Sequence, residues 1–285
     1  MSSTSPKILL PRLGLRPKKT LGQNFLVHPH QARRIVDALE PGQDETVVEI
    51  GAGLGALTVY LARAARRVVA LERDPALARF LREEIFPEAP AVEVLCQDVL
   101  KFDFLGFSRE TGRPLAVVGN LPYQITSPLL FKLLEQRQAL SRAVLMMQQE
   151  VGARLMAKPG TKDYGVLTVL LRHDFAIQRL FTLGPANFYP PPQVDSVVLL
   201  LTPAAASPPA RDRDLLARVV KAAFGQRRKT LNNTLTARAE GFGLEPEQLR
   251  AIFADLNIDP KRRGETLSLA EFVAVSNKIS ELSKD

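Results

Sequence analysis

Four consecutive residues, Asn120, Leu121, Pro122 and Tyr123, combine groups that can act on an aromatic amine. Such an amine is a poor nucleophile, because its lone pair is delocalised into the ring. The Asn120 side-chain oxygen and the Leu121 backbone carbonyl could accept the two hydrogens of the amine. Pro122 fixes the backbone so that the Leu121 carbonyl points toward a ligand and does not accept a helical hydrogen bond. Tyr123 offers a flat face on which a base can stack. The tetrapeptide predicts methyl transfer by positioning, without a strong general base; a plain turn is the alternative.

A glycine-rich run, Gly51-Ala52-Gly53-Leu54-Gly55-Ala56, directly follows an apolar segment. Glycines at such a point let the backbone turn sharply and approach a ligand closely. The run fits the G-x-G-x-G pattern of many methyltransferases and also the G-x-G-x-x-A pattern of dinucleotide enzymes. Glu72 does not separate the two, because both ligands carry a ribose diol that a carboxylate can bind. The run alone leaves S-adenosylmethionine, a nicotinamide cofactor and a turn without ligand open.

Short apolar segments alternate with segments of helical periodicity over the first two thirds of the chain. This alternation predicts a parallel sheet covered on both faces, an α/β fold of Rossmann-like type. Because ligands bind at the carboxyl edge of such a sheet, Asp98 and Asn120, which each follow a strand, are expected near the glycine run. Asp98 could accept from an adenine amine or simply cap a turn. Strands are expected at 45–50, 68–71, 92–95, 115–118, 143–147 and, near an edge, 194–201.

A proline-rich linker at 203–209 marks a change of composition, and only helical patterns follow it. Ser268 and Glu271 form a capping box that predicts the start of the last helix. We therefore expect a catalytic domain with a basic N-terminal segment over residues 1–203. A small all-helical domain that binds RNA is expected over residues 204–285.

The 285 residues carry a net charge of +8, which is unevenly distributed. Residues 1–34 hold +7 and residues 211–229 hold +5, so the remainder is −4. This pattern indicates a polyanion contacted at two places, with solvated surface as the alternative. No apolar run is long enough for a membrane helix, and the single Cys96 excludes an internal disulfide. Three scattered histidines indicate no metal centre, and the missing export signal predicts a cytoplasmic protein.

These motifs resemble one known family, the ribosomal RNA adenine dimethyltransferases, and most closely those that act on the small subunit. The resemblance implies a class I S-adenosylmethionine-dependent methyltransferase fold. It also implies dimethylation of the exocyclic N6 amine of two adjacent adenosines near the 3′ end of the RNA, during ribosome biogenesis. The matching segments include Gly22-Gln23-Asn24-Phe25-Leu26, Glu49-Ile50-Gly51, Glu72, Gln97-Asp98, Gly119-Asn120-Leu121-Pro122-Tyr123, Gln149-Glu150, Phe188-Tyr189-Pro190-Pro191-Pro192-Gln193-Val194-Asp195-Ser196 and Phe224-Gly225-Gln226-Arg227-Arg228-Lys229-Thr230-Leu231.

The resemblance further implies a role for single residues. At the target base, Phe188 would close opposite Tyr123, next to the reaction centre at Asn120, whereas core packing is the other interpretation of Phe188. Within the cofactor site, Glu72 would bind the ribose hydroxyls and Asp98 the adenine. The expected cofactor-binding residues are Gln23, Asn24, Leu26, Gly51, Gly53, Glu72, Asp98 and Asn120.

The expected partners are small-subunit ribosomal RNA and the assembling small subunit, contacted by a monomer. Residues 227–229 are three consecutive cations that are expected to open the second helix of the small domain, and because cations near a helix N-terminus oppose its dipole, they favour a phosphate partner. The RNA-binding residues expected on this basis, and from the basic N-terminal segment, are Lys18, Lys19, Arg227, Arg228 and Lys229.

The chain departs from the family pattern at three positions, Ala52, Arg73 and Gln124. None removes a reacting group, so we expect activity, although Arg73 and Gln124 could alter cofactor affinity. Three other functions stay open: a non-catalytic RNA-binding assembly factor, a nicotinamide dehydrogenase, and adenine methylation of large-subunit RNA or DNA. The dehydrogenase would leave Asn-Leu-Pro-Tyr without a role.

Overall fold

The computed structural model describes residues 5–283 and divides the chain into two compact units. The first unit comprises residues 1–152 and 176–203, and the second comprises residues 153–175 and 204–285. A first domain over residues 1–203 was predicted to include 153–175, but these residues belong to the second unit. The segment contains α8 (Val166–Asp174), which packs against α9 (Arg213–Phe224) and α12 (Leu269–Leu282). Its apolar residues are therefore buried by helices that come later in the chain.

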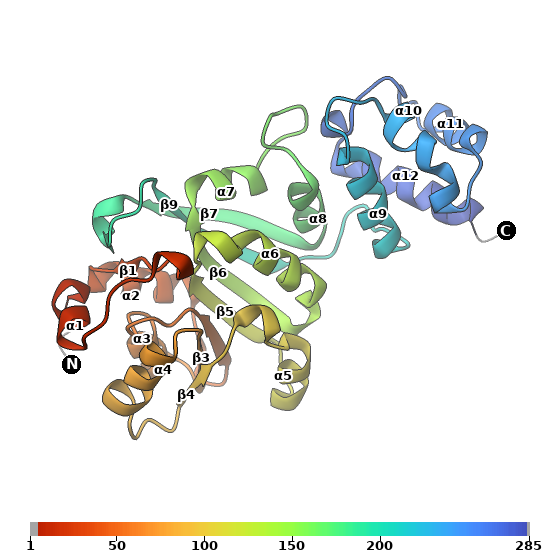
Figure 1. Ribbon diagram of the computed structural model, residues 1–285. Coiled ribbons are helices and arrows are strands. Elements are labelled where there is room, and N and C mark those ends of the chain that lie inside the picture. Colours follow the sequence, from red (N-terminus) through yellow and green to blue (C-terminus); the bar gives the residue numbers. More distant parts are fainter. Residues whose placement is uncertain (1–4, 284–285) are drawn as a thin grey trace. The chain divides into compact units, whose positions relative to one another are not determined.

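A seven-stranded sheet forms the centre of the first unit, in the order β4-β3-β2-β5-β6-β9-β7 (Figure 1). The pairs β4–β3, β3–β2, β2–β5 and β5–β6 are parallel, and β9 is antiparallel to β6. The chain builds outward from β2 through β3 and β4, and then returns to the other side of β2 as β5. The strands are β2 (Thr46–Ile50), β3 (Arg67–Glu72), β4 (Val92–Cys96), β5 (Leu115–Asn120), β6 (Leu140–Gln148), β7 (Phe175–Leu183) and β9 (Ser196–Pro203).

Helices cover both faces of this sheet, as the alternating pattern predicts. One core cluster joins α2 and α3 to the sheet residues Val47, Val68 and Val144, and a second joins α4 to Ala70 and Val94. Figure 1 shows α5 and α6 on the other side of the sheet. The helices are α2 (Pro29–Leu39), α3 (Thr58–Ala64), α4 (Pro75–Phe80), continued by the π-turn η2 (Leu81–Ile85), α5 (Phe104–Thr111), α6 (Thr126–Glu135) and α7 (Gln149–Leu155).

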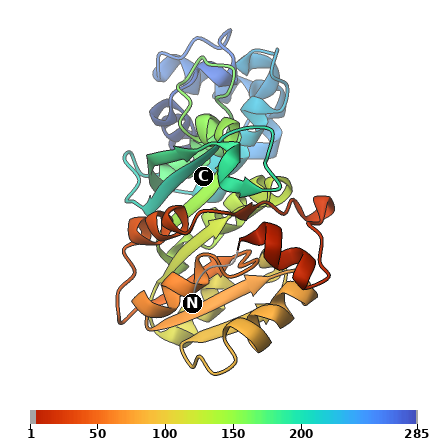
Figure 2. The ribbon, with the colours of Figure 1, turned by 90° about the vertical axis from the view of Figure 1, so that its left-hand side faces the viewer.

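The described part of the segment before the sheet contains regular elements that the sequence patterns did not predict. It forms α1 (Pro6–Arg12), η1 (Lys19–Leu21) and β1 (Phe25–Leu26). In a separate two-stranded ribbon, β1 pairs antiparallel with β8 (Phe188–Tyr189), placing Leu26 opposite Phe188. Figure 2 shows α1 beside the orange helices of the same unit. The ribbon fixes the N-terminal segment against the body of the first unit.

The second unit is helical throughout the described residues. The predicted capping box is present: Ser268 Oγ accepts from the Glu271 N–H, and Glu271 Oε2 accepts from the Ser268 N–H. None of the helices in residues 5–283 has the length and apolar character needed to cross a membrane. Besides α8, the elements are α9, α10 (Leu231–Thr234), η7 (Thr236–Phe242), α11 (Pro246–Asp255), η8 (Gly264–Thr266) and α12.

One ionic network joins three parts of the first unit. Arg142 on β6 donates to both carboxylate oxygens of Glu45, at 2.8 and 2.6 Å. It also donates to the carbonyls of Leu39 and Glu40, at 2.6 and 2.7 Å, where α2 ends. Both charged side chains are largely buried. Arg142 therefore satisfies helix carbonyls that otherwise lack a donor and holds the loop that enters β2.

We expect Arg142→Met to lower the free energy of unfolding at neutral pH by about 2–3 kcal/mol, because Glu45 then loses its partner. Arg142 lowers the pKa of Glu45, so this stabilisation exists above the ordinary value of 4.5 and is lost as the pH falls through the folded-state pKa. Urea unfolding on both sides of that value measures the effect. The control is Arg113→Met, which breaks an exposed pair with Asp44 and should change little. If Arg142→Met lowered the free energy of unfolding by the same amount below the folded-state pKa of Glu45 as at neutral pH, the ionic contribution would be contradicted.

Candidate active site

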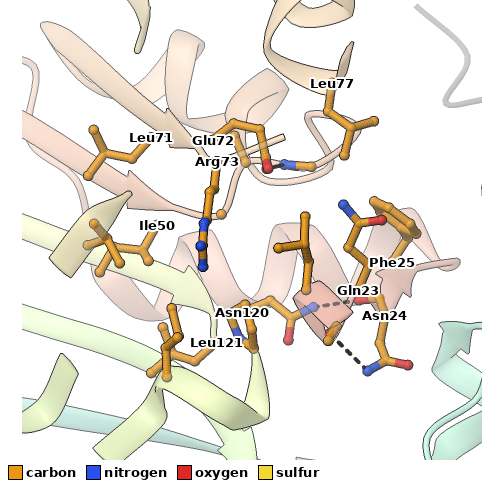
Figure 3. Close-up of a pocket in the computed structure, with 18 of the residues that line it drawn as sticks. Gln23, Asn24, Phe25, Ile50, Leu71, Glu72, Arg73, Leu77, Asn120 and Leu121 are labelled. Atoms are coloured by element: carbon orange, nitrogen blue, oxygen red, sulfur yellow. Dashed lines mark hydrogen bonds between the residues drawn. The ribbon is translucent and has the colours of Figure 1, made fainter. Parts of the chain in front are cut away.

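A pocket lies where β2 and β5 run side by side, outside their carboxyl ends (Figure 3). It encloses about 1120 Å³, part of it open to solvent. This is the topological switch point of the sheet, where open α/β sheets bind ligands. Residues 20–26 line the pocket from the N-terminal segment. The other lining residues lie at the carboxyl ends of β2, β3 and β5 or in the segments that follow β2, β3, β4 and β5.

Gly119 allows β2 and β5 to approach at this point. It lies opposite Ile50, and a Cβ on it would stand 2.7 Å from the Ile50 carbonyl oxygen. On the β2 side, Gly51 and Gly53 have φ values of +71° and +58°, which disfavour other residues. A Cβ on Gly53 would also meet the Phe25 ring at 3.3 Å. The glycine loop therefore presents bare backbone to the pocket, directly beside Asn120.

Asn120 is held in a defined orientation. Its Nδ2 donates to the backbone carbonyl of Asn24 at 2.8 Å, across 96 positions of sequence. The amide's donor end is thus engaged, and its Oδ1 end remains available as an acceptor. Tyr123, at the start of η4 (Tyr123–Ile125), lines the same pocket; burial raises the pKa of its hydroxyl, which is hydrogen-bonded with Ser196. The tetrapeptide is therefore a fixed wall of the pocket.

Glu72 ends β3 and is almost fully buried. Its Oε2 accepts from the Gly53 N–H at 2.8 Å, and its Oε1 accepts from the Asp74 N–H at 2.7 Å. Desolvation by burial raises the pKa of this carboxyl, against the effect of these hydrogen bonds. Each carboxylate oxygen keeps a second lone pair, so the group can still accept from a diol.

Asp98 follows β4, and one oxygen of its carboxylate caps η3 (Val99–Lys101) through the Leu100 N–H. Its Oδ2 lies 3.6 Å from Nε of Arg73, the departure noted in the sequence. Figure 3 shows the Arg73 side chain reaching from the end of β3 across the pocket. Because Arg73 is 58% exposed, this pair contributes little to stability. A ligand amine can therefore compete for Asp98 at small cost.

Glu49 is a pocket residue to which the sequence analysis assigned no role. It is 1% exposed, and its Oε2 has no hydrogen-bond partner. Burial, with a smaller contribution from the neighbouring Glu72, raises the pKa of its carboxyl to about 8. One sequence feature could have pointed to Glu49, namely an acidic residue inside an otherwise apolar strand. Acidic residues are rarely buried without a partner, so such a position is a candidate for a functional role.

The structure separates the predicted site residues into three groups. Phe188 is 3% exposed, does not line the pocket and packs in the core with Leu26 and Ile35, which agrees with the core-packing interpretation and leaves its role at the target base a prediction. Its side chain points with that of Leu26 because the two residues face each other across the ribbon. Arg227, Arg228 and Lys229 belong to the second unit. The remaining predicted residues in the pocket are Gln23, Asn24, Leu26, Gly51, Gly53, Glu72, Asp98, Asn120, Leu121, Pro122 and Tyr123.

The model of the ribosomal RNA adenine dimethylase family matches residues 14–275. The chain belongs to this family. Its relatives include the ribosomal RNA small subunit methyltransferase A of Bacillus mycoides, 44% identical over 277 residues, or 96% of this chain and 94% of the relative. The protein of the same name from Bacillus cereus is 43% identical over the same shares. The resemblance stated from the sequence is confirmed, and the chain is an adenine dimethyltransferase by family.

Two solved structures share the fold of this dimethylase. A dimethyladenosine transferase from Plasmodium falciparum has a TM-score of 0.75 at 24% identity, over 88% of this chain and 95% of that one. The 23S rRNA methyltransferase ErmE has a TM-score of 0.67 at 25% identity, over 90% of this chain and 100% of that one. The predicted Rossmann-like methyltransferase fold is confirmed.

S-adenosylmethionine is the methyl donor of this dimethylase family, and the residues of the pocket fit it. There is open space beside the backbone of Gly51 that a ligand can occupy, because even an added Cβ would come no nearer than 3.8 Å to another atom. Glu72 and Asp98 offer carboxylate oxygens at separate points of the wall. These pocket features would also fit a nicotinamide cofactor, so it is the match to the dimethylase family that decides for S-adenosylmethionine.

We expect Glu49→Gln to become progressively more stabilising, relative to the parent protein, as the pH rises from 4.5 to about 8. The parent retains a buried proton that the unfolded chain has lost in this range, so its stability falls with pH, whereas glutamine does not titrate. Urea unfolding of both proteins at several pH values measures the difference. A difference that does not change with pH would show that Glu49 titrates normally.

Proposed function

We propose that this protein dimethylates the N6 amines of two adjacent adenosines near the 3′ end of small-subunit ribosomal RNA. The observation that carries the proposal is the fixed Asn120 amide, whose Nδ2 is bound by the Asn24 carbonyl. Its Oδ1 is thereby kept as an acceptor beside the glycine loop. The names of the relatives, which are small-subunit methyltransferases, support the choice of substrate.

In this mechanism the chain positions the amine and holds its hydrogens. Asn120 Oδ1 and the Leu121 carbonyl accept the two amine hydrogens, which draws the nitrogen lone pair out of the ring. Tyr123 provides the stacking face, and its hydroxyl is anchored by Ser196. When bound, S-adenosylmethionine supplies an electrophilic methyl group on its sulfonium. Positioning of the amine accounts for most of the acceleration, because no strong base is required.

The cofactor itself is proposed to lie against four features of the wall. Glu72 accepts from its ribose hydroxyls, and Asp98 accepts from its adenine amine. Gly51 and Gly53 give its methionine part access to bare backbone. Asn24 and Leu26 line the opposite side from the N-terminal segment. Gln23 lines the same side, but its amide is engaged with Asp74 and the Lys18 N–H.

Asn120→Ala should lower kcat at least about 100-fold, because the transition state loses a preorganised hydrogen-bond partner. Cofactor affinity should stay within about tenfold of that of the parent. Turnover and calorimetric titration with S-adenosylmethionine separate these two effects. Asn120→Asp is the matched control: it keeps an acceptor oxygen but loses the donor to Asn24, so its turnover should be intermediate. Near-normal turnover in Asn120→Ala would contradict the mechanism.

Incubation with labelled S-adenosylmethionine and a mixture of unmethylated small and large subunits tests the substrate. Mass analysis of the RNA should find two neighbouring dimethylated adenosines near its 3′ end. Label only in large-subunit RNA would instead support the alternative that the likeness to ErmE suggests. Binding of small subunits without any methyl transfer would support a non-catalytic assembly factor.

The proposed RNA surface on the second unit consists of exposed cations on a turn. Residues 227–229 were expected to open a helix, but the turn between α9 and α10 contains them, and α10 begins only at Leu231. Arg227 is engaged internally, since its Nε donates to Glu265 and its other nitrogen to the Lys162 carbonyl. Arg228 and Lys229 are exposed, so we assign the phosphate contacts to these two.

Replacing Arg228 and Lys229 together with glutamine should weaken RNA binding at every sequence. The plot of log binding constant against log salt concentration should also become less steep, by about 1–2 in slope, because each phosphate contact contributes about 0.7–0.9 to that slope. Filter binding over a range of salt concentrations measures the slope. Arg250→Gln on α11 is the control, because Glu247 already pairs with that guanidinium. An unchanged slope in the double variant would mean that the turn is solvated surface.

The remaining partner assignments are part of the same proposal. The substrate is the assembling small subunit, the protein acts as a monomer, and it works in the cytoplasm, where small subunits are built. Lys19, exposed at the start of η1, is retained as a candidate phosphate ligand beside the pocket. Lys18 is not retained, because its ammonium is paired with Asp74 at 2.8 Å.

A further inference from the structure

Residues 18–24, here called the strap, cross the pocket between its two walls. On the β5 side, the strap is tied by Asn120 Nδ2 to the Asn24 carbonyl at 2.8 Å and by Gln124 Nε2 to the Lys19 carbonyl at 3.4 Å. Gly22 in the strap lies over Pro122, at a distance where an added Cβ would just touch the proline ring. Figure 3 shows Gln23, Asn24 and Phe25 on one side of the pocket, facing the side chains that follow β3.

On the β3 side, a single carboxylate holds the strap. Asp74 Oδ2 accepts from Lys18 Nζ at 2.8 Å and from Gln23 Nε2 at 3.2 Å. The Lys18 N–H in turn donates to Gln23 Oε1 at 2.8 Å, which closes the network. The Asp74 side chain is 4% exposed, so its charge depends on these partners.

Asp74 also contacts the pocket wall through its backbone. Its N–H donates to Glu72 Oε1 at 2.7 Å, on the carboxylate proposed to bind the ribose. Its Oδ1 caps α4 through the Ala76 N–H at 3.1 Å. One residue thus connects the strap, the start of α4 and Glu72.

We propose that Asp74 is a positioning residue for the cofactor, which latches the strap closed through Lys18 and Gln23 while its backbone orients Glu72. A helix cap alone would not require this arrangement, because Ser, Asn or Asp would serve equally at that position. The arrangement uses both carboxylate oxygens as acceptors, Oδ1 for the Ala76 N–H and Oδ2 for Lys18 and Gln23, and an amide or hydroxyl side chain has only one such oxygen. The ammonium of Lys18 accordingly serves cofactor binding. This inference rests on the cofactor site proposed above.

Asp74→Asn separates the latch from the cap. Asparagine keeps a capping oxygen for Ala76 and leaves the backbone donor to Glu72 unchanged, but its amide presents N–H groups to Lys18 and Gln23. We expect the affinity for S-adenosylmethionine, measured by calorimetry, to fall about tenfold, the size of one charge-assisted hydrogen bond. Hydrogen exchange without cofactor should become faster in residues 18–24 and remain unchanged in α4.

Glu88→Gln and Lys101→Met are the controls, because each removes one exposed charge from the same unit. Both should bind the cofactor as the parent protein does. Lys18→Met should weaken binding like Asp74→Asn, and the double variant should be no weaker than the worse single one. Lys18→Arg should restore most of the affinity.

Two results would overturn the latch: binding by Asp74→Asn within about twofold of the parent, or additive effects of Asp74→Asn and Lys18→Met. Failure of the parent protein to bind S-adenosylmethionine would instead refute the cofactor site itself. Exchange that rises in α4 as strongly as in the strap would show that Asp74 acts only as a helix cap.

Discussion

The parallel pairing of β2 with β5 is the constraint on which the rest of the site depends. Gly119 lies so close to Ile50 that any Cβ would stand 2.7 Å from its carbonyl oxygen. A larger residue would separate the strands and move Asn120 away from the glycine loop. Because β2 and β5 both end at this edge of the sheet, the bare backbone of Gly51 and the fixed amide of Asn120 become neighbours. The chemistry proposed for the pocket needs this proximity more than it needs any reactive side chain.

Desolvation dominates the electrostatics of the same edge. Burial raises the pKa of both Glu49 and Glu72; the Glu72 charge also raises the pKa of Glu49, and the Asp74 charge that of Glu72. Two buried acids at one edge destabilise the protein without ligand, unless backbone N–H groups or a proton compensate. Glu72 has two such N–H groups, whereas one oxygen of Glu49 has no partner. The carboxylates favour a cationic ligand, and the methyl donor of this family carries a sulfonium.

The basic side chains of the protein fall into two groups, those paired with acids and those free to contact a polyanion. Some cations are paired with acids of the same chain: Lys18 with Asp74, and Arg227 with Glu265. Others, such as Arg228 and Lys229, remain exposed and available to a polyanion. The total of 38 Lys and Arg residues therefore overstates the cationic surface that RNA can use, because some of these side chains are paired with acids and hold loops in place. The strap and the turn after α9 each depend on one such internal pair.

The sequence by itself determined the α/β alternation, the glycine loop, the order of Glu72, Asp98 and Asn120, and the capping box at Ser268. Each is a local pattern whose physics acts within a few residues, so the corresponding elements form as expected. Tertiary structure alone decided the rest. It placed residues 153–175 with the later helices, turned Phe188 into the core, paired Lys18 with Asp74 and buried Glu49. These features join residues far apart in the chain, and a local pattern holds no information about which distant surface will cover a side chain or supply its counter-charge.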